Sequence, residues 1–92
     1  MNKVRILIAD DHALVREGLR RVLETRRDWE VCAEAVNGRD AVAKACACKP
    51  DVVIVDFSMP ELNGLEATRQ IHAALPRTEV LVLTMHETDS LV

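Results

Sequence analysis

The stretch "VVIVDFSMPELNG", residues 52–64, decides the fold. Its first four residues are apolar and β-branched, as expected of a strand that is buried on both faces of a parallel sheet. The run ends in a single acid, Asp56, and Pro60, Asn63 and Gly64 after it are typical of a loop. The stretch therefore predicts an α/β fold, and it raises the question of why a carboxylate stands at the end of a buried strand.

On either side of this stretch, the chain alternates between the period of strands and the period of helices. Short apolar or alternating runs predict strands over residues 4–9, 30–35, 51–56 and 79–85. Helical spacing predicts helices within 10–28, 39–47 and 64–75, and the start of a fourth helix over 86–92, capped by Thr88. The order β-α-β-α-β-α-β predicts one domain, residues 1–92, with a parallel sheet and helices on both faces.

The same spacing predicts which side chains point inward. In the helices these are Val15, Leu19, Val22 and Leu23, then Ala41, Val42, Ala45 and Cys46, and finally Leu65, Thr68, Ile71, His72 and Leu75. In the second strand, alternation places Val31, Ala33 and Ala35 on one side. Each set predicts a face packed against the sheet.

Composition excludes several classes of protein. Apolar residues are 49% of the chain and charged residues 29%, which indicates a soluble globular domain rather than a disordered one. A net charge of −3 argues against broad nucleic-acid binding. No run approaches the roughly 18 apolar residues of a membrane span, and the apolar run at the N-terminus is too short for a signal peptide. We therefore expect a cytoplasmic protein with no membrane partner.

The three cysteines form no recognisable disulfide framework or zinc motif. An odd number with no second cluster argues against a set of disulfides, and the Cys-x-Cys of Cys46 and Cys48 has no matching pair for zinc. We interpret Cys32, Cys46 and Cys48 as small buried residues.

Acidic residues follow two predicted strands. Asp10 and Asp11 end the first strand, Asp56 ends the third, and the hydroxyl of Thr84 ends the fourth. If the first and third strands are neighbours, three carboxylates meet in one crevice, where two of them 4 Å apart repel by about 1 kcal/mol in water and about 4 kcal/mol at an effective dielectric of 20. Mg²⁺ would relieve the repulsion, and Mn²⁺ would also fit. The alternative is that the acids are helix caps and solvated strand ends; we favour a metal site because all four residues fall at one edge.

These motifs resemble the receiver domain of bacterial two-component response regulators, which has a flavodoxin-like fold. "ILIADDH", residues 6–12, is similar to the acidic pair of that family, and residues 52–64 are similar to its phosphoacceptor strand and loop. "VLVLTMHE", residues 80–87, is similar to its fourth strand. The histidine in "DDHALVREGL", residues 10–19, makes the resemblance closest to the NarL/FixJ (LuxR-type) branch.

The resemblance implies a role for each site residue. Asp56 would accept a phosphoryl group from the phosphohistidine of a sensor histidine kinase. Asp11 would coordinate Mg²⁺ directly, Asp10 directly or through water, and the backbone carbonyl of Ser58 would be a ligand beside Asp56. Thr84 would donate its hydroxyl to a phosphoryl oxygen. The domain would catalyse its own modification and so control a DNA-binding output domain.

Two histidines near the site receive separate interpretations. We expect His12 to be a loop or first-turn residue that bonds backbone groups rather than a metal ligand. His86, two residues after Thr84, is either a gate for the water that hydrolyses the phosphoryl group or an exposed loop residue.

The family pattern extends beyond these 92 residues. It implies strand order 2-1-3-4-5, with a lysine on the fifth strand that pairs with the phosphoryl group. We therefore expect order 2-1-3-4, with strand 5 and helix 5 missing, in the first part of a longer receiver. The fourth strand would then offer an open edge, which predicts a homodimer or a domain-swapped assembly through residues 79–85.

Two other functions stay open. The chain could be a receiver fragment that binds or dimerises but does not switch. It could also be another Mg²⁺-dependent enzyme with an aspartyl nucleophile, of the haloacid-dehalogenase type. That class would need a second acid two residues after Asp56, where Ser58 stands.

Overall fold

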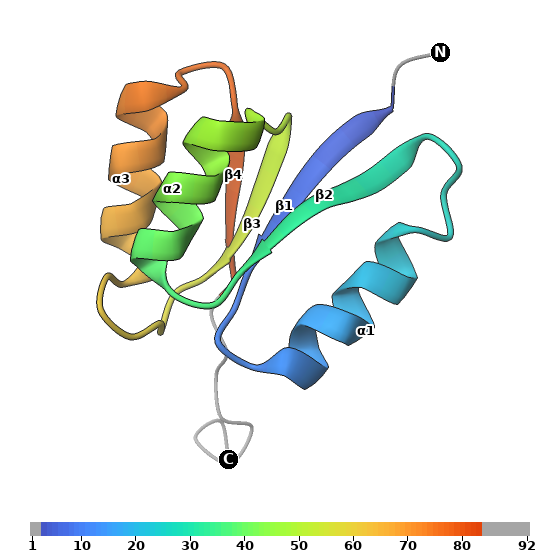
Figure 1. Cartoon of the computed structure of the whole chain (residues 1–92), viewed down its shortest axis with the longest axis horizontal. Coiled ribbons are helices and arrows are strands. Elements are labelled where there is room, and N and C mark those ends of the chain that lie inside the picture. Colours follow the sequence, from blue (N-terminus) through green and yellow to red (C-terminus); the bar gives the residue numbers. More distant parts are fainter. Residues whose placement is uncertain (1–2, 84–92) are drawn as a thin grey trace, which may run out of the picture.

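The computed structural model describes residues 3–83, which form a three-layer α/β structure (Figure 1). The elements in chain order are β1 (Val4–Ala9), α1 (Ala13–Leu23), β2 (Trp29–Ala35), α2 (Gly38–Cys48), β3 (Val52–Asp56), α3 (Gly64–Ala74) and β4 (Glu79–Leu83). The strands are parallel, in the order β2-β1-β3-β4. The predicted fold class and strand order are confirmed.

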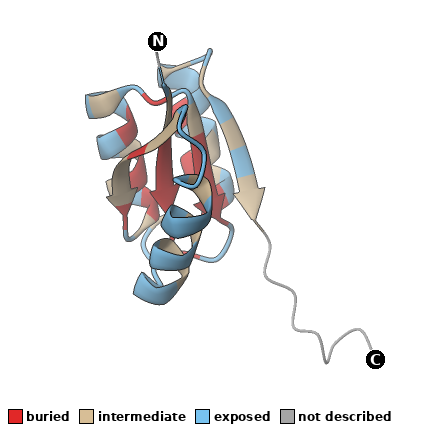
Figure 2. Cartoon of the chain, turned by 90° about the vertical axis from the view of Figure 1, so that its right-hand side faces the viewer, coloured by how far each residue is buried: buried red, intermediate tan, exposed pale blue. Residues whose placement is uncertain are grey.

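The two central strands are apolar on both faces because helices cover both. Helices α2 and α3 lie on one face of the sheet and α1 on the other (Figure 1). Residues such as Leu7 and Val53 point toward α2 and α3, whereas Ile8 and Ile54 belong to the cluster on the α1 side. Figure 2 shows the buried residues concentrated in the middle of the molecule. This arrangement explains the continuous apolar runs in the sequence.

Helix side chains are buried more completely on one face of the sheet than on the other. The cluster on the α2/α3 face includes the fully buried Ala41, Ala45 and Ile71 from the helices, together with Met59 from the loop after β3. On the other face, α1 contributes no buried residue, and its Leu19 and Leu23 are only partly covered. Small alanines let α2 approach the sheet closely, so that face excludes water more completely.

In the middle of β2 the regular alternation of side chains between the two faces of the sheet is interrupted, which the sequence prediction missed. Ile6 pairs with Val31 and Leu7 with Ala33, so Cys32 is an extra residue with no partner on β1. This is a β-bulge. Val31 therefore packs on the α1 side while Ala33 packs on the α2/α3 side, and the prediction that Val31, Ala33 and Ala35 share one face is wrong.

Several predicted inward residues are exposed, and helical geometry explains each case. Val22, Leu65, Cys46 and His72 all face solvent. At about 100° per residue, Leu65 and His72 lie at least about 100° around α3 from the buried Ile71. The contact stripe of a helix on a sheet is about that wide, so residues at or beyond its margins stay in water.

The remaining sequence predictions fall at the end of the chain. Thr84, His86, Thr88 and the predicted helix from residue 86 lie outside the described residues. None of the helices between residues 3 and 83 is long and apolar enough to cross a membrane.

Candidate functional site

The acids at the ends of β1 and β3 are brought together by the strand order. Ala9 is the register partner of Val55, so Asp10 and Asp56 follow at the same edge of the sheet. The backbone N–H of Asp10 donates to the carbonyl oxygen of Ala35 at 3.0 Å, which holds this end of β1 against β2. The predicted convergence at the carboxyl edge is confirmed for these two residues.

Four side chains form the resulting acidic cluster: Asp10, Asp11, His12 and Asp56. One ligand atom from each lies within 4.8 Å of all the others. Asp10 and Asp56 are each only 3% exposed, whereas Asp11 and His12 face solvent. The cluster therefore has a buried floor of two carboxylates and a polar rim open to water.

His12 turns toward the acids, which the sequence interpretation did not expect. Its backbone N–H donates to Asp10 Oδ1 at 2.8 Å, and its Nδ1 lies 2.9 Å from the same oxygen and 3.2 Å from Asp11 Oδ1. The hydrogen bond to Asp10 raises the pKa of His12, and the negative charges of Asp11 and Asp10 raise it further. The only sequence signal was the spacing, since an aspartate readily bonds the backbone two residues ahead of it.

Asp56 has little to stabilise its charge. Its hydrogen bond is a long one, 3.3 Å from the backbone N–H of Ser58 to Oδ1. Burial raises the pKa of Asp56, and the charges of Asp10 and Asp11 add to this, while the Ser58 N–H and His12 oppose it. Like-charged groups that lose water in this way gain most from a cation between them.

The donor set fits a hard divalent cation. Three carboxylates whose oxygens lie within 4.8 Å of one another supply the oxygen ligands that Mg²⁺ and Mn²⁺ prefer, and the exposed rim leaves room for water. Ser58 is exposed beside Asp56, and the role expected for its carbonyl stays a prediction. The role expected for Thr84 falls on a residue outside the described range.

Gly64 holds the loop after β3 against the site. A Cβ on this residue would lie 2.4 Å from the carbonyl oxygen of Asp56, so only glycine lets the start of α3 come this close. Its φ is not positive, which shows that close approach, rather than an unusual backbone angle, is the reason for glycine. The side chain of Asn63 accepts from the Glu66 N–H at 2.9 Å and caps the same helix. The local sequence at the start of α3 thus fixes the far end of the loop against Asp56.

Arg16 ties α1 to the site, and sequence reasoning missed it. Its Nη1 donates to the carbonyl oxygen of Asp10 at 2.7 Å, and its Nε donates to Glu34 Oε1 at 3.0 Å. The side chain of Arg16 is only 16% exposed, whereas that of Arg21 on the same helix faces solvent. Arg16 is a positioning residue for the end of β1.

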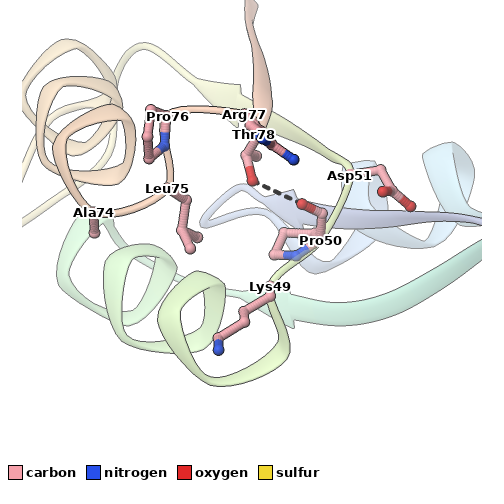
Figure 3. Close-up of a pocket in the computed structure, with 8 residues that line it drawn as sticks. All are labelled: Lys49, Pro50, Asp51, Ala74, Leu75, Pro76, Arg77 and Thr78. Carbon is pink, nitrogen blue, oxygen red and sulfur yellow. Dashed lines mark hydrogen bonds between the residues drawn. The ribbon is translucent and has the colours of Figure 1, made fainter.

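A cavity of about 390 Å³ lies at the opposite edge of the sheet (Figure 3). It lies between the end of α2, the start of β3 and the turn before β4, and its lining includes Lys49, Arg77 and Asp51. The Thr78 hydroxyl donates to the Pro50 carbonyl at 2.8 Å there. Because the ligating groups that converge among the described residues are those of Asp10, Asp11, His12 and Asp56, we place the candidate site at the acidic cluster rather than at this cavity.

Comparison with known proteins agrees with the geometry. The family model described as the response regulator receiver domain matches residues 6–92. The chain is 43% identical over 91 residues to the uncharacterised transcriptional regulatory protein YxjL of Bacillus subtilis, and 43% identical over 91 residues to the transcriptional regulatory protein DegU of Brevibacillus brevis. These matches cover 99% of this chain but 42% and 39% of the two relatives. The chain thus spans about two fifths of the length of these curated relatives.

A solved structure extends the likeness to the fold. The signal receiver domain of the response regulator NarL from Mycobacterium tuberculosis superimposes with a TM-score of 0.88 at 34% identity. The match covers 100% of this chain and 74% of that one. The family model and the NarL structure both describe receiver domains, and the two curated relatives are named as transcriptional regulatory proteins.

Proposed function

Because the chain belongs to the response regulator receiver domain family, we propose that it accepts a phosphoryl group on Asp56 from a sensor histidine kinase, with Mg²⁺ at the acidic cluster. Receivers are signalling domains rather than enzymes that turn over a separate substrate. The observation that carries the proposal is the convergence of Asp10, Asp11 and Asp56 within 4.8 Å at the carboxyl edge of the sheet.

The transfer forms one bond and breaks one. A carboxylate oxygen of Asp56 attacks the phosphorus of the donor phosphohistidine, a P–O bond forms, the P–N bond breaks, and the electron pair leaves on the imidazole nitrogen. When bound, Mg²⁺ neutralises charge that develops on the phosphoryl oxygens. Asp10, Asp11, Asp56 and the Ser58 carbonyl would hold the ion, and the hydroxyl of Thr84 would donate to a phosphoryl oxygen.

The raised pKa of Asp56 has a functional consequence. A carboxylate that is buried beside other acids is a destabilised anion, and so it gains more than an exposed one from a bound cation. Asp10 and His12 shape the site without forming a covalent bond. Their mutual hydrogen bond keeps the Asp10 carboxylate turned toward the rim.

Incubation with Mg²⁺ and acetyl phosphate, followed by mass spectrometry, tests the proposal. We expect one phosphoryl group on Asp56 in the unmodified chain and none in Asp56→Asn. Asp51→Ala, which removes the acid at the other end of β3, should be labelled like the unmodified chain.

The competing assignments predict other products. Phosphate on Ser58 or Thr84 with none on Asp56 would overturn the proposal. Labelling that is unchanged after Mg²⁺ is removed with a chelator would show that the acidic cluster is not a metal site.

For the whole protein we propose control of transcription in the cytoplasm. The relatives that carry this segment are named as transcriptional regulatory proteins, and most of their length lies outside the matched region. We propose that phosphorylation of Asp56 controls a DNA-binding part and that the receiver itself does not bind nucleic acid. A gel-shift assay with the receiver alone and with the whole protein separates the two contributions.

Self-association through β4 also stays a proposal. In the described sheet β4 pairs with β3 on one side only, and an unpaired strand edge can pair with another chain. A homodimer or a segment exchange through this edge would appear as a doubled mass in sedimentation at micromolar concentration. A compact monomer under the same conditions would contradict it.

A further inference from the structure

Two of the three cysteines meet across the interface between α2 and β2. Cys32 Sγ lies 3.4 Å from Cys48 Sγ, although the residues are 16 positions apart in the chain. Both side chains are partly buried, whereas Cys46 is exposed on the surface of α2. The interpretation of Cys46 as a buried residue is therefore wrong, whereas Cys32 and Cys48 are partly buried and form a thiol pair.

The bulge and the helix phase explain this pairing. Cys32 is the extra residue of β2 and follows Val31, which faces α1, so its side chain points to the α2 side. On α2, Cys48 lies about 20° around the axis from the buried Ala41, whereas Cys46 lies about 140° away. Only one of the two α2 cysteines can therefore reach β2.

The distance is short enough for covalent closure. A disulfide bond is about 2.05 Å long, so the two sulfurs would approach by roughly 1.4 Å, which small side-chain rotations can supply. Cys48 is the last residue of α2 and is followed by Lys49 in a left-handed conformation, so it stands at a helix end rather than inside a helix. Movement at a helix end disrupts fewer hydrogen bonds than movement in its middle.

The surroundings of the two thiols favour slow and selective oxidation. Burial raises the pKa of the Cys32 thiol to about 11, with a further contribution from Cys48, while the guanidinium of Arg5 opposes the shift. Little of Cys32 is therefore present as the thiolate at neutral pH, and the thiolate is the reactive form. Arg5 is fixed nearby, since its Nη1 donates to the carbonyl oxygen of Cys48.

We propose that the Cys32–Cys48 thiol pair is an oxidation site that forms an intramolecular disulfide with a low-molecular-weight disulfide such as oxidised glutathione. The thiolate of Cys48 attacks one glutathione sulfur, an S–S bond forms to Cys48, and one glutathione thiolate leaves. Cys32, after losing its proton, attacks the Cys48 sulfur and expels the second glutathione thiolate. The two protein thiols are oxidised, and one oxidised glutathione is reduced to two glutathione thiols.

The site is separate from the acidic cluster. The bulge is level with the step from Ile6 to Leu7 on β1, and Asp10 lies four residues beyond Ile6, which is about 13 Å along the strand. The disulfide would link β2 to the end of α2 and leave Asp10 and Asp56 in place. Mg²⁺ affinity should accordingly be the same in the oxidised and reduced chain.

Equilibration in glutathione buffers tests the proposal. The folded chain is incubated at a series of ratios of oxidised to reduced glutathione, free thiols are blocked by alkylation, and the peptides are mapped by mass spectrometry. We expect the loss of two of the three alkylatable thiols, a peptide linked through Cys32 and Cys48, and Cys46 alkylated.

Variants make the outcome specific. Cys46→Ser should form the same disulfide at the same glutathione ratio, whereas Cys48→Ser and Cys32→Ser should form none. In urea the preference for Cys32 and Cys48 should disappear, which shows that the fold creates it. Persistence of all three thiols in the folded chain, or links to Cys46 in comparable yield, would overturn the proposal whether or not Asp56 is phosphorylated.

Discussion

Strand β3 carries an aspartate at each end, and the two have opposite environments. Asp51, just before the strand, is exposed; its Oδ2 accepts from the Arg5 N–H at 2.8 Å, and its own N–H donates to the Arg5 carbonyl at 2.8 Å. Its carbonyl oxygen also accepts from the Glu79 N–H at 3.0 Å. Asp56, the last residue of the strand, is buried beside Asp10, and within residues 3–83 it accepts one long hydrogen bond. Asp51 thus has hydrogen-bond partners at the amino edge of the sheet, whereas Asp56 at the carboxyl edge lies among other negative charges.

The difference shows that the residues suited to ligand binding lie at the carboxyl edge of the sheet. At the amino edge, each polar group of Asp51 joins one strand to the next, so the residue contributes to stability. At the carboxyl edge, Asp10, Asp11 and Asp56 repel one another, so the folded state carries a cost that a bound cation can relieve. A site of this kind is less stable when empty, as is usual for functional residues.

Mg²⁺ affinity should show the largest difference between substitutions at the carboxyl edge and substitutions at the amino edge of the sheet. We expect Asp11→Ala and Asp56→Asn each to weaken Mg²⁺ binding by about 100-fold, because each removes one negative charge from the coordination sphere. Asp51→Ala should leave the affinity unchanged. Isothermal titration calorimetry measures all three, and an equal loss in Asp51→Ala would remove the distinction between the edges.

Backbone spacing at the carboxyl edge should have the next largest effect. Gly64→Ala is expected to destabilise the fold by about 1–3 kcal/mol, because the new Cβ would overlap the Asp56 carbonyl. The matched control is Gly18→Ala in α1, where nothing lies within 4 Å of the new Cβ. That variant should gain up to about 1 kcal/mol from helix propensity. Urea denaturation of both variants measures the difference, and equal effects would contradict the close approach at Gly64.

Charge removal should stabilise the empty site. Without Mg²⁺, Asp56→Asn is expected to be more stable than the unmodified chain by about 1 kcal/mol at neutral pH, since it removes repulsion from Asp10 and Asp11. With saturating Mg²⁺ the order should reverse, because only the unmodified chain gains full binding energy. Thermal melts with and without Mg²⁺ decide this.

The pH dependence of that gain follows from the raised pKa of Asp56. The folded state holds the Asp56 proton more tightly than the unfolded state does, so the unmodified chain loses stability as pH rises from the ordinary aspartate range through the higher folded pKa. The advantage of Asp56→Asn should therefore be absent in strong acid and complete above the folded pKa. A constant difference at all pH values would show that repulsion is not its cause.

The amino edge should give the smallest effect. Asp51→Ala removes an acceptor for the Arg5 N–H and is expected to cost about 0.5–1.5 kcal/mol, the usual value of one hydrogen bond. Because Asp51 is exposed, water replaces part of the lost bond. Urea denaturation measures the loss, and a stabilising effect like that of Asp56→Asn would contradict the comparison.

Much of the site could be predicted because it depends on chain order. The apolar run before Asp56 and the acidic pair after residues 4–9 both mark strand ends, and parallel strands place such ends at one edge. The observed register of β1 and β3 brings Asp10 and Asp56 together as that reasoning requires. The contacts of His12 and Arg16 could not be predicted in this way, because side-chain direction at a turn depends on neighbours that are distant in sequence.

By itself, the sequence determined the α/β class and the acids at the strand ends, since hydrophobic period and chain order are local properties, and the resemblance to receiver domains supplied the strand order that brings those acids together. Only the tertiary structure decided the phase of β2 and the pairing of Cys32 with Cys48. A bulge shifts side chains to the other face without changing composition, and alternation alone cannot reveal it. The exposure of Cys46 and the contact of Cys48 likewise depend on how α2 is rotated against the sheet, and that rotation is set by close packing of Ala41 and Ala45.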